Sequence, residues 1–273
     1  IEHSVHMLNF LKNLSLNIKI SLLGAASVLI TAGALLGLVV WQSGQYNILA
    51  QSEVDTLINA DLDHITQGVY NLVRTEDEAV QQQVDANLNV ARHVLANAGE
   101  IGLSDETVVW TAVNQLTNIR TTITLPRFLV GGQWLGRNTD PAVPTAIVDE
   151  IEQLVGDTAT VFQRMNDKGD MLRVATTIKT SEGKRAIGTY IPAVNPDGTP
   201  NPVIAAIIKG DTYHGRAFVV NAWYLTAYQP IKDSTGSLVG MLYVGEKQKN
   251  VEARLRQAIL QTKVGKTGYV YVL

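Results

Sequence analysis

Cationic and hydroxyl-bearing side chains recur along residues 158–245, within short runs that alternate like strands. Guanidinium groups suit bidentate capture of a carboxylate, tyrosine hydroxyls add hydrogen-bond donors, and an indole can form one wall of a ligand pocket. The predicted ligand-binding residues are Arg173, Arg185, Tyr190, Tyr213, Arg216, Trp223 and Tyr228. They favour a pocket for a small anionic metabolite, most simply a carboxylate.

A purely structural role for the same arginines stays open at this point. Each could instead pair with a carboxylate such as Asp170, Asp211 or Glu246 and hold a turn together. Arg173 lies within a strand-like apolar run, which suits a partly buried charge that has a partner. His214 begins another strand-like run, and it is a further candidate to reach the pocket.

Other kinds of site find little support in the sequence. The chain has no Cys and five His, so thiolate metal sites and a Cys nucleophile are excluded, and the His positions lack zinc-ligand spacing. Neither a Ser/His/Asp set nor a phosphate-binding glycine loop is present. The net charge of −3 argues against a nucleic-acid surface. We therefore expect no enzyme activity, no metal, no cofactor and no nucleic-acid partner.

The elements that must position these side chains are short strands separated by turns. Five strands are expected at Thr158–Met165, Met171–Ile178, Tyr213–Asn221, Trp223–Lys232 and Leu238–Val244. Before them we expect a short helix at Ser104–Leu116, strands at Thr121–Val130 and Gln133–Gly136 joined by a Gly131-Gly132 hairpin turn, and a helix at Val148–Leu154. Further helical segments are expected at Val203–Lys209 and Glu246–Gln261. This mixture predicts an α+β domain.

An uncharged block near the N-terminus predicts a membrane span. Ile20–Trp41 holds 22 residues without a charge, about 33 Å of helix against a hydrocarbon core of about 30 Å. Lys12 and Lys19 precede it, and the next basic residue is Arg74, so the positive-inside rule places the N-terminus in the cytoplasm. A cleaved signal peptide is the alternative, but its apolar region would be shorter.

A long amphipathic helix is expected next, over residues 42–98. One apolar stripe runs through Val54, Ile58, Leu62, Ile65, Val69 and Leu72, and it resumes at Val80, Val84, Leu88, Ala91 and Leu95. The heptad-like spacing suits packing along a partner helix, which predicts a homodimer. Packing of the stripe within its own domain explains it equally well.

Long contiguous segments carry a family resemblance over nearly everything from Trp41 onward. They are Thr158–Arg164 (TATVFQR), Gly169–Thr180 (GDMLRVATTIKT), Gly183–Ala193 (GKRAIGTYIPA), Gly210–Ile231, Val239–Gly245 and Val264–Leu273. The chain resembles the Cache 3/Cache 2 fusion sensor of bacterial methyl-accepting chemotaxis proteins. The resemblance implies PAS-like modules outside the membrane, each with an antiparallel five-stranded sheet and short helices.

Together these patterns predict the organisation of the chain. Residues 1–19 form a cytoplasmic N-terminus, 20–41 a transmembrane helix, 42–98 a long extracytoplasmic helix, 99–245 a Cache sensor module, 246–263 a connecting helix and 264–273 the first strand of a second, truncated module. Because that strand has no partner after it, we expect a longer protein. The resemblance implies that a second span, a HAMP linker and a cytoplasmic signalling hairpin follow, acting on a kinase and adaptor array.

Three functions remain in competition. The first is the sensing region of a chemoreceptor in the bacterial inner (plasma) membrane, single-pass in this fragment, with its sensor in the periplasm or extracellular space and an organic acid or amino acid as ligand. The second is the same sensor joined to a histidine kinase or diguanylate cyclase. The third, a membrane-anchored extracytoplasmic enzyme or structural protein, lacks a catalytic constellation.

Overall fold

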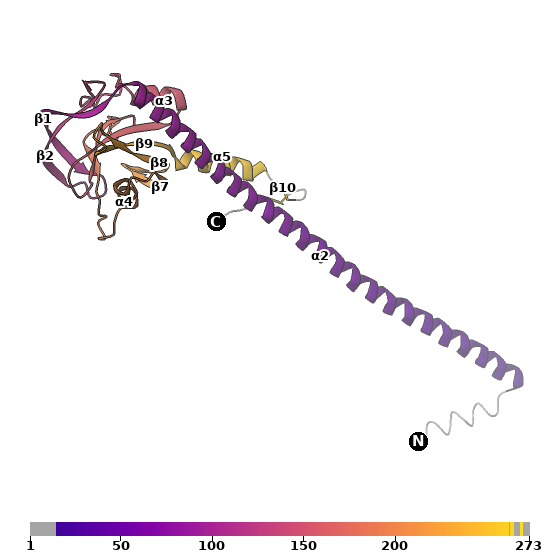
Figure 1. Cartoon of the computed structure of the whole chain (residues 1–273). Helices are drawn as coiled ribbons and strands as arrows, with labels where there is room; N and C mark the ends of the chain where they lie inside the picture. The colour runs from indigo at the N-terminus through magenta and orange to yellow at the C-terminus, as the bar shows by residue number, and fades with distance from the viewer. Residues whose placement is uncertain (1–14, 262, 265–267, 270–273) are drawn as a thin grey trace. The chain divides into compact units, whose positions relative to one another are not determined.

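The computed structural model describes residues 15–261, 263–264 and 268–269 (Figure 1). The chain divides into two compact units, Ile1–Gly68 and Val69–Leu273. The first helix, α2 (Leu16–Asn97), contributes residues to both units. The remaining elements are β1 (Ile101–Asn114), β2 (Arg120–Val130), β3 (Gln133–Trp134), α3 (Val148–Val155), β4 (Thr158–Arg164), β5 (Met171–Thr176), β6 (Thr189–Ile191), α4 (Pro202–Lys209), β7 (Tyr213–Val219), β8 (Ala222–Lys232), β9 (Leu238–Lys247), α5 (Gln248–Gln261), β10 (Lys263–Val264) and β11 (Gly268–Tyr269).

The described part of the first unit consists of the N-terminal portion of α2. One stretch of this helix is long and apolar enough to cross a membrane, and none of its most apolar window is buried by the rest of the chain. The block Ile20–Trp41, which the sequence predicts as a span, is helical throughout. Its large apolar side chains are exposed, as they are along a helix whose surroundings are lipid.

A nine-stranded sheet organises the second unit, in the order β3-β2-β1-β6-β5-β4-β9-β8-β7. The five strands expected between residues 158 and 244 are β5, β4, β9, β8 and β7, which form one continuous antiparallel block. The sheet then extends beyond the expected five strands, because β6 pairs with β5 and carries β1, β2 and β3 on its other side. β6 and β1 are the one parallel pair in the described sheet.

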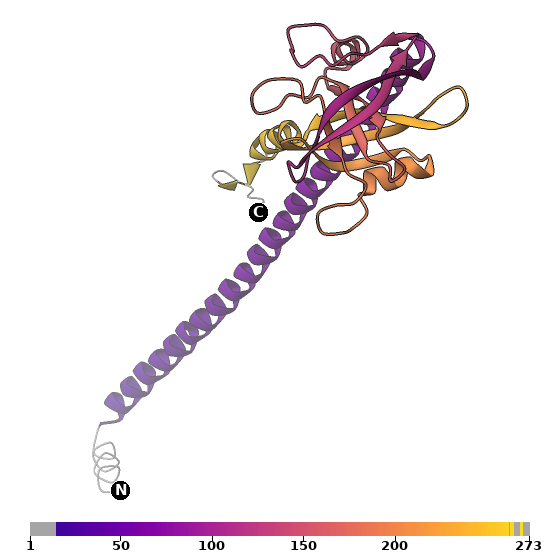
Figure 2. The same ribbon diagram turned by 90° about the vertical axis from the view of Figure 1, so that its left-hand side faces the viewer.

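The helix expected at Ser104–Leu116 is wrong, because these residues belong to β1. β1 pairs with β2 over most of its length, in a long twisted hairpin (Figure 2). The run from Val108 to Val113 is rich in β-branched residues, and Trp110 and Ala112 are buried on alternate positions, which is a strand period. The strand preference of that run outweighs the helix-start signal at Ser104-Asp105-Glu106.

Most of the other local expectations are confirmed. α3 and α4 lie where short helices were expected, and Gly131 and Gly132, at φ 58° and 75°, form the turn between β2 and β3. α5 begins slightly later than expected, since β9 continues through Lys247. Of the strand expected at Thr267–Leu273, Gly268–Tyr269 is β11 and pairs with β10; its other residues lie outside the described ones.

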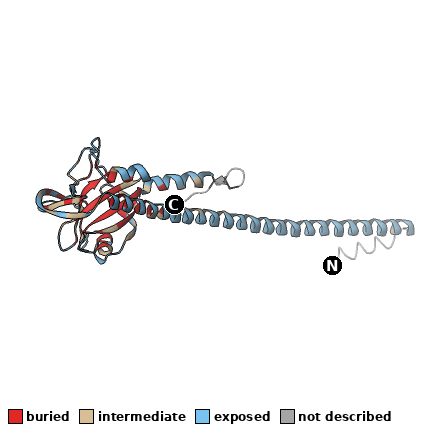
Figure 3. Cartoon of the chain, turned by 45° about the horizontal axis from the view of Figure 1, so that its top comes forward, coloured by how far each residue is buried: buried red, intermediate tan, exposed pale blue. Residues whose placement is uncertain are grey.

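Two apolar clusters form the core of the second unit, and the buried residues concentrate there (Figure 3). The first cluster joins the sheet to α2, α3 and α5. The second joins it to α4 and contains the buried tyrosines 224, 228 and 243. α4 and α3 lie on different sides of the sheet (Figure 1), so each cluster has its own helical cover.

The apolar stripe of α2 has two different environments. Val80, Val84, Leu88, Ala91 and Leu95 are buried in the first cluster, so this half of the stripe packs within its own domain. In the first unit Val54, Ile58 and Leu62 remain about half exposed, at 52%, 51% and 46%. Packing within the domain therefore accounts for the second half of the stripe, whereas packing along a partner helix remains a prediction for the first half.

Candidate ligand-binding site

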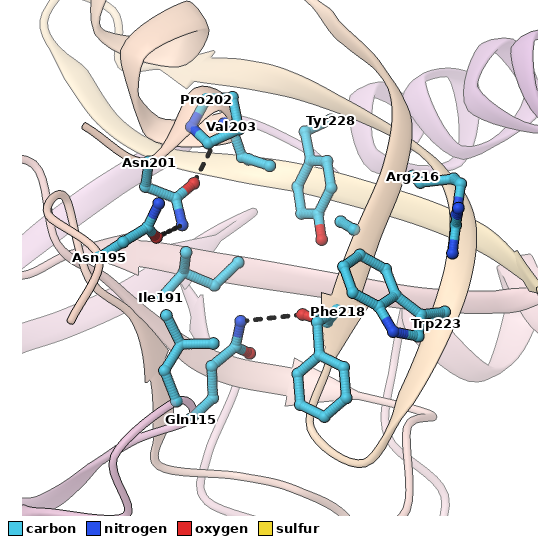
Figure 4. Close-up of a pocket in the computed structure, with 12 residues that line it drawn as sticks. Gln115, Ile191, Asn195, Asn201, Pro202, Val203, Arg216, Phe218, Trp223 and Tyr228 are labelled. Atoms are coloured by element: carbon cyan, nitrogen blue, oxygen red, sulfur yellow. Dashed lines mark hydrogen bonds between the residues drawn. The ribbon is translucent and has the colours of Figure 1, made fainter. Parts of the chain in front are cut away.

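A cavity of about 250 Å³ opens beside β7 and β8, on the side of the sheet that α4 covers (Figure 4). It is lined by Gln115, Leu116, Ile191, Asn195, Asn201, Pro202, Val203, Arg216, Ala217, Phe218, Trp223 and Tyr228. These residues come from the ends of β1 and β6, the loop before α4, the first turn of α4, and two adjacent strands. The lining is mainly apolar with a few polar groups, as in small-molecule sites.

Tyr228 supplies a polar group to the cavity that no other described residue satisfies. Its side chain is fully buried, and its hydroxyl has no hydrogen-bond partner among the described residues. Figure 4 shows the hydroxyl directed into the space between Ile191 and Trp223. Burial raises the pKa of Tyr228, which keeps the hydroxyl protonated and able to donate. An unsatisfied buried hydroxyl costs free energy unless a ligand or water completes it.

Arg173 lies behind the wall that Tyr228 and Gln115 form. It is fully buried, and its guanidinium lies 4.7 Å from the centre of the Phe162 ring. Nη1 donates to the Thr189 hydroxyl, Nη2 donates to Gln115 Oε1 at 3.5 Å, and Nε has no partner among the described residues. No carboxylate of the described chain lies within ion-pair distance of this guanidinium, so its charge has no counter-ion there.

The tyrosines around Arg173 do not neutralise it. Burial lowers the pKa of Arg173 to about 10, so it remains charged at neutral pH. Burial raises the pKa of Tyr224 to about 12 and that of Tyr243 well above its ordinary value, so both remain neutral. A buried cation surrounded by neutral hydroxyls creates a positive potential that reaches the adjacent cavity, because low polarisability screens it weakly.

The amides of the cavity wall are already engaged. Gln115 Nε2 donates to the Phe218 carbonyl at 3.1 Å, which links the end of β1 to β7. Asn201 caps α4, since its Oδ1 accepts from the Val203 and Ile204 backbone amides at 3.1 and 3.4 Å. Its Nδ2 donates to Asn195 Oδ1 at 3.1 Å. These bonds hold the wall in place.

Arg216 and Trp223 lie at the exposed side of the cavity. The guanidinium of Arg216 is 4.9 Å from the centre of the Trp223 ring, and Phe218 meets the same indole edge-on at 5.7 Å. Trp223 is 49% exposed. Arg216 has no ion-pair partner among the described residues, so a second cation is presented at the mouth.

The structure brings five of the seven predicted residues together. Arg216, Trp223 and Tyr228 line the cavity, Arg173 lies behind it, and Tyr213 packs edge-on against Tyr228 at 6.1 Å. The Tyr213 hydroxyl donates to the Arg216 carbonyl at 2.9 Å, so it supports the strand that carries Arg216. His214, the further candidate, instead pairs with Asp85 of α2 at 2.7 Å.

Two predicted residues lie elsewhere. Tyr190 packs on the first apolar cluster, across the sheet from the cavity. Arg185 is 5% exposed and donates to both carboxylate oxygens of Asp149, at 2.7 and 2.8 Å. It also donates to nearby backbone carbonyls, including that of Thr176 at 2.9 Å. Arg185 therefore has the structural role considered above, with Asp149 as its partner in place of the three carboxylates expected.

Gln115, Asn195 and Asn201 line the cavity but were not among the residues predicted to do so. Gln115 was assigned to a helix that does not exist, which concealed its place at the end of a strand. Asn201 carried a usable signal, since Asn followed by Pro is a typical start of a helix. Nothing in the sequence indicated that Gln115 and Phe218, 103 positions apart, would be bonded.

A second polar cluster lies where α2, β4 and α5 meet. Arg254 of α5 pairs with Glu246 at 2.5 Å and with Glu76 of α2 at 3.2 Å. Asp157 is beside them and accepts from Asn87 Nδ2 at 2.7 Å. Burial, and then the charge of Glu246, raise the pKa of Asp157 to about 6. In this cluster, as elsewhere in the described residues, no three His, Asp or Glu side chains are arranged so that they could hold a metal ion.

Comparison with known proteins assigns this chain to a family. The Cache 3/Cache 2 fusion domain matches residues 47–273, whereas no curated protein matches the chain. Among solved structures, the chain is similar to the sensor domain of E. coli DcuS, at 15% identity over 40% of this chain and 70% of that one, with a TM-score of 0.27.

A second similar structure is the periplasmic domain of RsbU from Chlamydia trachomatis. Identity is 12%, coverage is 71% of this chain and 56% of that one, and the TM-score is 0.34. The family assignment rests on the sequence match, which extends from within α2 to the last residue and includes every residue of the cavity. The chain belongs to the Cache 3/Cache 2 fusion domain family.

Proposed function

We propose that this chain is the extracytoplasmic ligand-sensing region of a transmembrane receptor. The observation that carries the proposal is the cavity in which the unpaired Tyr228 hydroxyl adjoins the buried, uncompensated Arg173. Groups left unsatisfied in this way are costly to a structural domain and useful to a binding site. The ligand is a small metabolite, an organic acid or an amino acid, and the module itself catalyses no reaction.

Ligand binding to the whole chain tests this role. The protein, purified in detergent micelles, is screened by thermal shift against organic acids, amino acids, amines and sugars, and hits are measured by calorimetry. Saturable binding that the cavity substitution Trp223→Ala weakens supports the proposal. Binding that is indifferent to Trp223→Ala, or no binding across the whole panel, contradicts it.

The orientation in the membrane has its own support and its own test. The apolar stretch of α2 and the placement of Lys12 and Lys19 before it favour a cytoplasmic N-terminus and a sensor outside the bacterial inner membrane. Alkaline phosphatase fused after Leu49 should then be active in bacteria. Activity of a cytoplasmic reporter at the same position would reverse the topology.

Chemotaxis is the output that we propose, through a signalling hairpin that acts on a kinase and adaptor array. Its support is the resemblance of the sensor segments to those of methyl-accepting receptors. A histidine kinase or diguanylate cyclase output is the alternative. The coding sequence after residue 273 separates them, since a long charged heptad hairpin supports the first and a catalytic domain the second.

The receptor is further proposed to act as a homodimer. The support is the exposed apolar stripe of α2 in the first unit, where Val54, Ile58 and Leu62 recur four residues apart on one helix face. Association through this stripe would bring two membrane-spanning helices side by side. The variant Ile58→Asp, which places a charge in this stripe, tests the proposal.

A further inference from the structure

We infer that the ligand of the cavity is an organic acid anion with an apolar body and no ammonium group. This inference rests on the proposed sensory function and narrows its ligand class, which so far includes amino acids. It follows from the charges, acceptors and apolar surfaces that the described cavity offers.

The charges around the cavity are all of one sign. Arg173 lies behind the wall without a counter-ion, and Arg216 lies at the mouth without an ion-pair partner among the described residues. None of the residues that line the cavity is Asp or Glu. A carboxylate therefore enters a positive potential, whereas an ammonium group enters the same potential at a cost.

An ammonium group would also find no carboxylate in the lining, and the amide oxygens there already accept hydrogen bonds from the protein. The Asn201 side-chain oxygen is held by the α4 backbone amides, and that of Asn195 by Asn201. The Phe218 carbonyl accepts from Gln115, and the Gln115 side-chain oxygen accepts from Arg173. Taking an ammonium out of water requires a carboxylate or several acceptors, so the remaining lone pairs of these oxygens compensate an amino acid only in part for its lost hydration.

The Tyr228 hydroxyl favours a carboxylate over an ammonium group. The Tyr228 hydroxyl is protonated, buried and unpaired, and it is directed into the cavity (Figure 4). A carboxylate oxygen accepts a hydrogen bond from such a hydroxyl more strongly than a neutral oxygen does. Tyr228 is therefore assigned as the hydrogen-bond donor to the head group, which reaches the buried hydroxyl once the side chains that cover it move aside. Arg173 acts behind it as a positioning and electrostatic residue.

The rest of the lining suits a hydrocarbon body. Apolar surface comes from Leu116, Ile191, Val203, Ala217, Phe218 and Trp223. The volume of about 250 Å³ accommodates a molecule of small-metabolite size. A branched aliphatic or phenyl group fills such a space better than a second charged group.

Matched pairs of compounds test the inference on the whole chain. The first pair is 4-methylpentanoate and leucine, and the second is 3-phenylpropanoate and phenylalanine, because the members of each pair share a carbon skeleton and differ in the ammonium group. The uncharged amides of both acids complete the set. We expect each acid to bind at least tenfold more tightly than its amino acid and its amide, as measured by calorimetry.

Two substitutions test the residues. Tyr228→Phe removes only the hydroxyl, and it should weaken binding of the acid about three- to tenfold while leaving the amide unaffected. Arg173→Met should weaken binding of the acid more than tenfold. Arg164→Met is the matched control, since Arg164 lies on β4, outside the cavity, and bonds the Asn166 and Asp167 carbonyls.

The outcomes separate this inference from the proposed function. If an amino acid or an amide binds as tightly as the matched acid, the inference is overturned and the sensory role stands. If acids bind best but Tyr228→Phe and Arg173→Met both leave their affinity unchanged, the assignment to these residues is overturned. If neither these compounds nor the wider metabolite panel binds, the proposed function fails together with the inference.

Discussion

Two buried arginines of the second unit differ in whether a carboxylate pairs with them. That difference predicts that substitution by Met changes the free energy of unfolding differently at the two positions. Arg173 is 0% exposed and has no carboxylate partner among the described residues, whereas Arg185 is 5% exposed and is held bidentately by Asp149. Arg173→Met should leave the free energy of unfolding unchanged or raise it. Arg185→Met should lower it strongly.

The magnitude for Arg173 follows from its pKa. Burial lowers this pKa to about 10 from an ordinary value above 12, and at about 1.4 kcal/mol for each tenfold change in proton affinity the charged form is disfavoured by about 3 kcal/mol. Met removes that cost and forfeits the bonds to Thr189 and Gln115 and the stacking on Phe162, together about 2–3 kcal/mol. We expect a net change between zero and about 1 kcal/mol of added stability.

Arg185 presents the reverse case. Its replacement leaves the Asp149 carboxylate, which is 20% exposed, without a partner. It also leaves several backbone carbonyls without the hydrogen-bond donor that Arg185 supplies. Removing one member of a buried ion pair costs about 3–5 kcal/mol. For a domain of this size that corresponds to a fall in Tm of roughly 10 °C.

Thermal and urea unfolding of the whole chain in detergent micelles measure both variants. Near-UV circular dichroism follows the packing of the sheet domain, since helix α2 dominates the far-UV signal. If Arg173→Met lowers the Tm as far as Arg185→Met does, Arg173 is a structural group. The lack of a carboxylate partner for Arg173 would then be no evidence for an anionic ligand.

Three further predictions concern other parts of the chain. Burial raises the pKa of Asp157 to about 6, so the folded state binds the proton of this carboxyl more tightly than the unfolded state does. The stability that Asp157 contributes is therefore present below pH 3.8 and is lost as the pH rises through 6. The Tm of the parent should fall between pH 4 and 7 relative to that of Asp157→Asn. Gly240→Ala should lower stability by about 1–3 kcal/mol or more in urea unfolding, since its Cβ would collide with the Phe162 carbonyl oxygen. Ile58→Asp should weaken self-association in analytical ultracentrifugation, because it places a charge in the exposed apolar stripe of α2.

Each of these predictions has a matched control. Gly102→Ala in β1 has no atom within 4 Å of the added Cβ and should change stability little. Asn59→Asp adds the same charge beside the stripe of α2 and should leave association intact. A pH profile identical in the parent and Asp157→Asn, equal effects of the two glycine changes, or equal effects of the two aspartates would each contradict the corresponding reasoning.

Local patterns in the sequence determined most of the elements. The uncharged block, the α2 stripe, the Gly131-Gly132 turn and the five strands between residues 158 and 244 all appear in the structure. Each depends on interactions between neighbours in the chain, such as a period of two or 3.6 residues or a turn that requires positive φ. The error at residues 104–116 arose where two local signals conflicted and pairing with β2 decided between them.

The site was determined only by the tertiary structure. The sequence identified residues able to bind an anion, but it did not show which arginine has a carboxylate partner, and Arg173 and Arg185 look alike until Asp149 is placed beside one of them. The cavity joins the end of β1 to β7 and to the cap of α4, through residues about 100 positions apart. Such proximity depends on the order of strands in the sheet and on the parallel pairing of β1 with β6. Strand order is a property of the whole packed core, because each strand takes the neighbours that together bury both faces of the sheet.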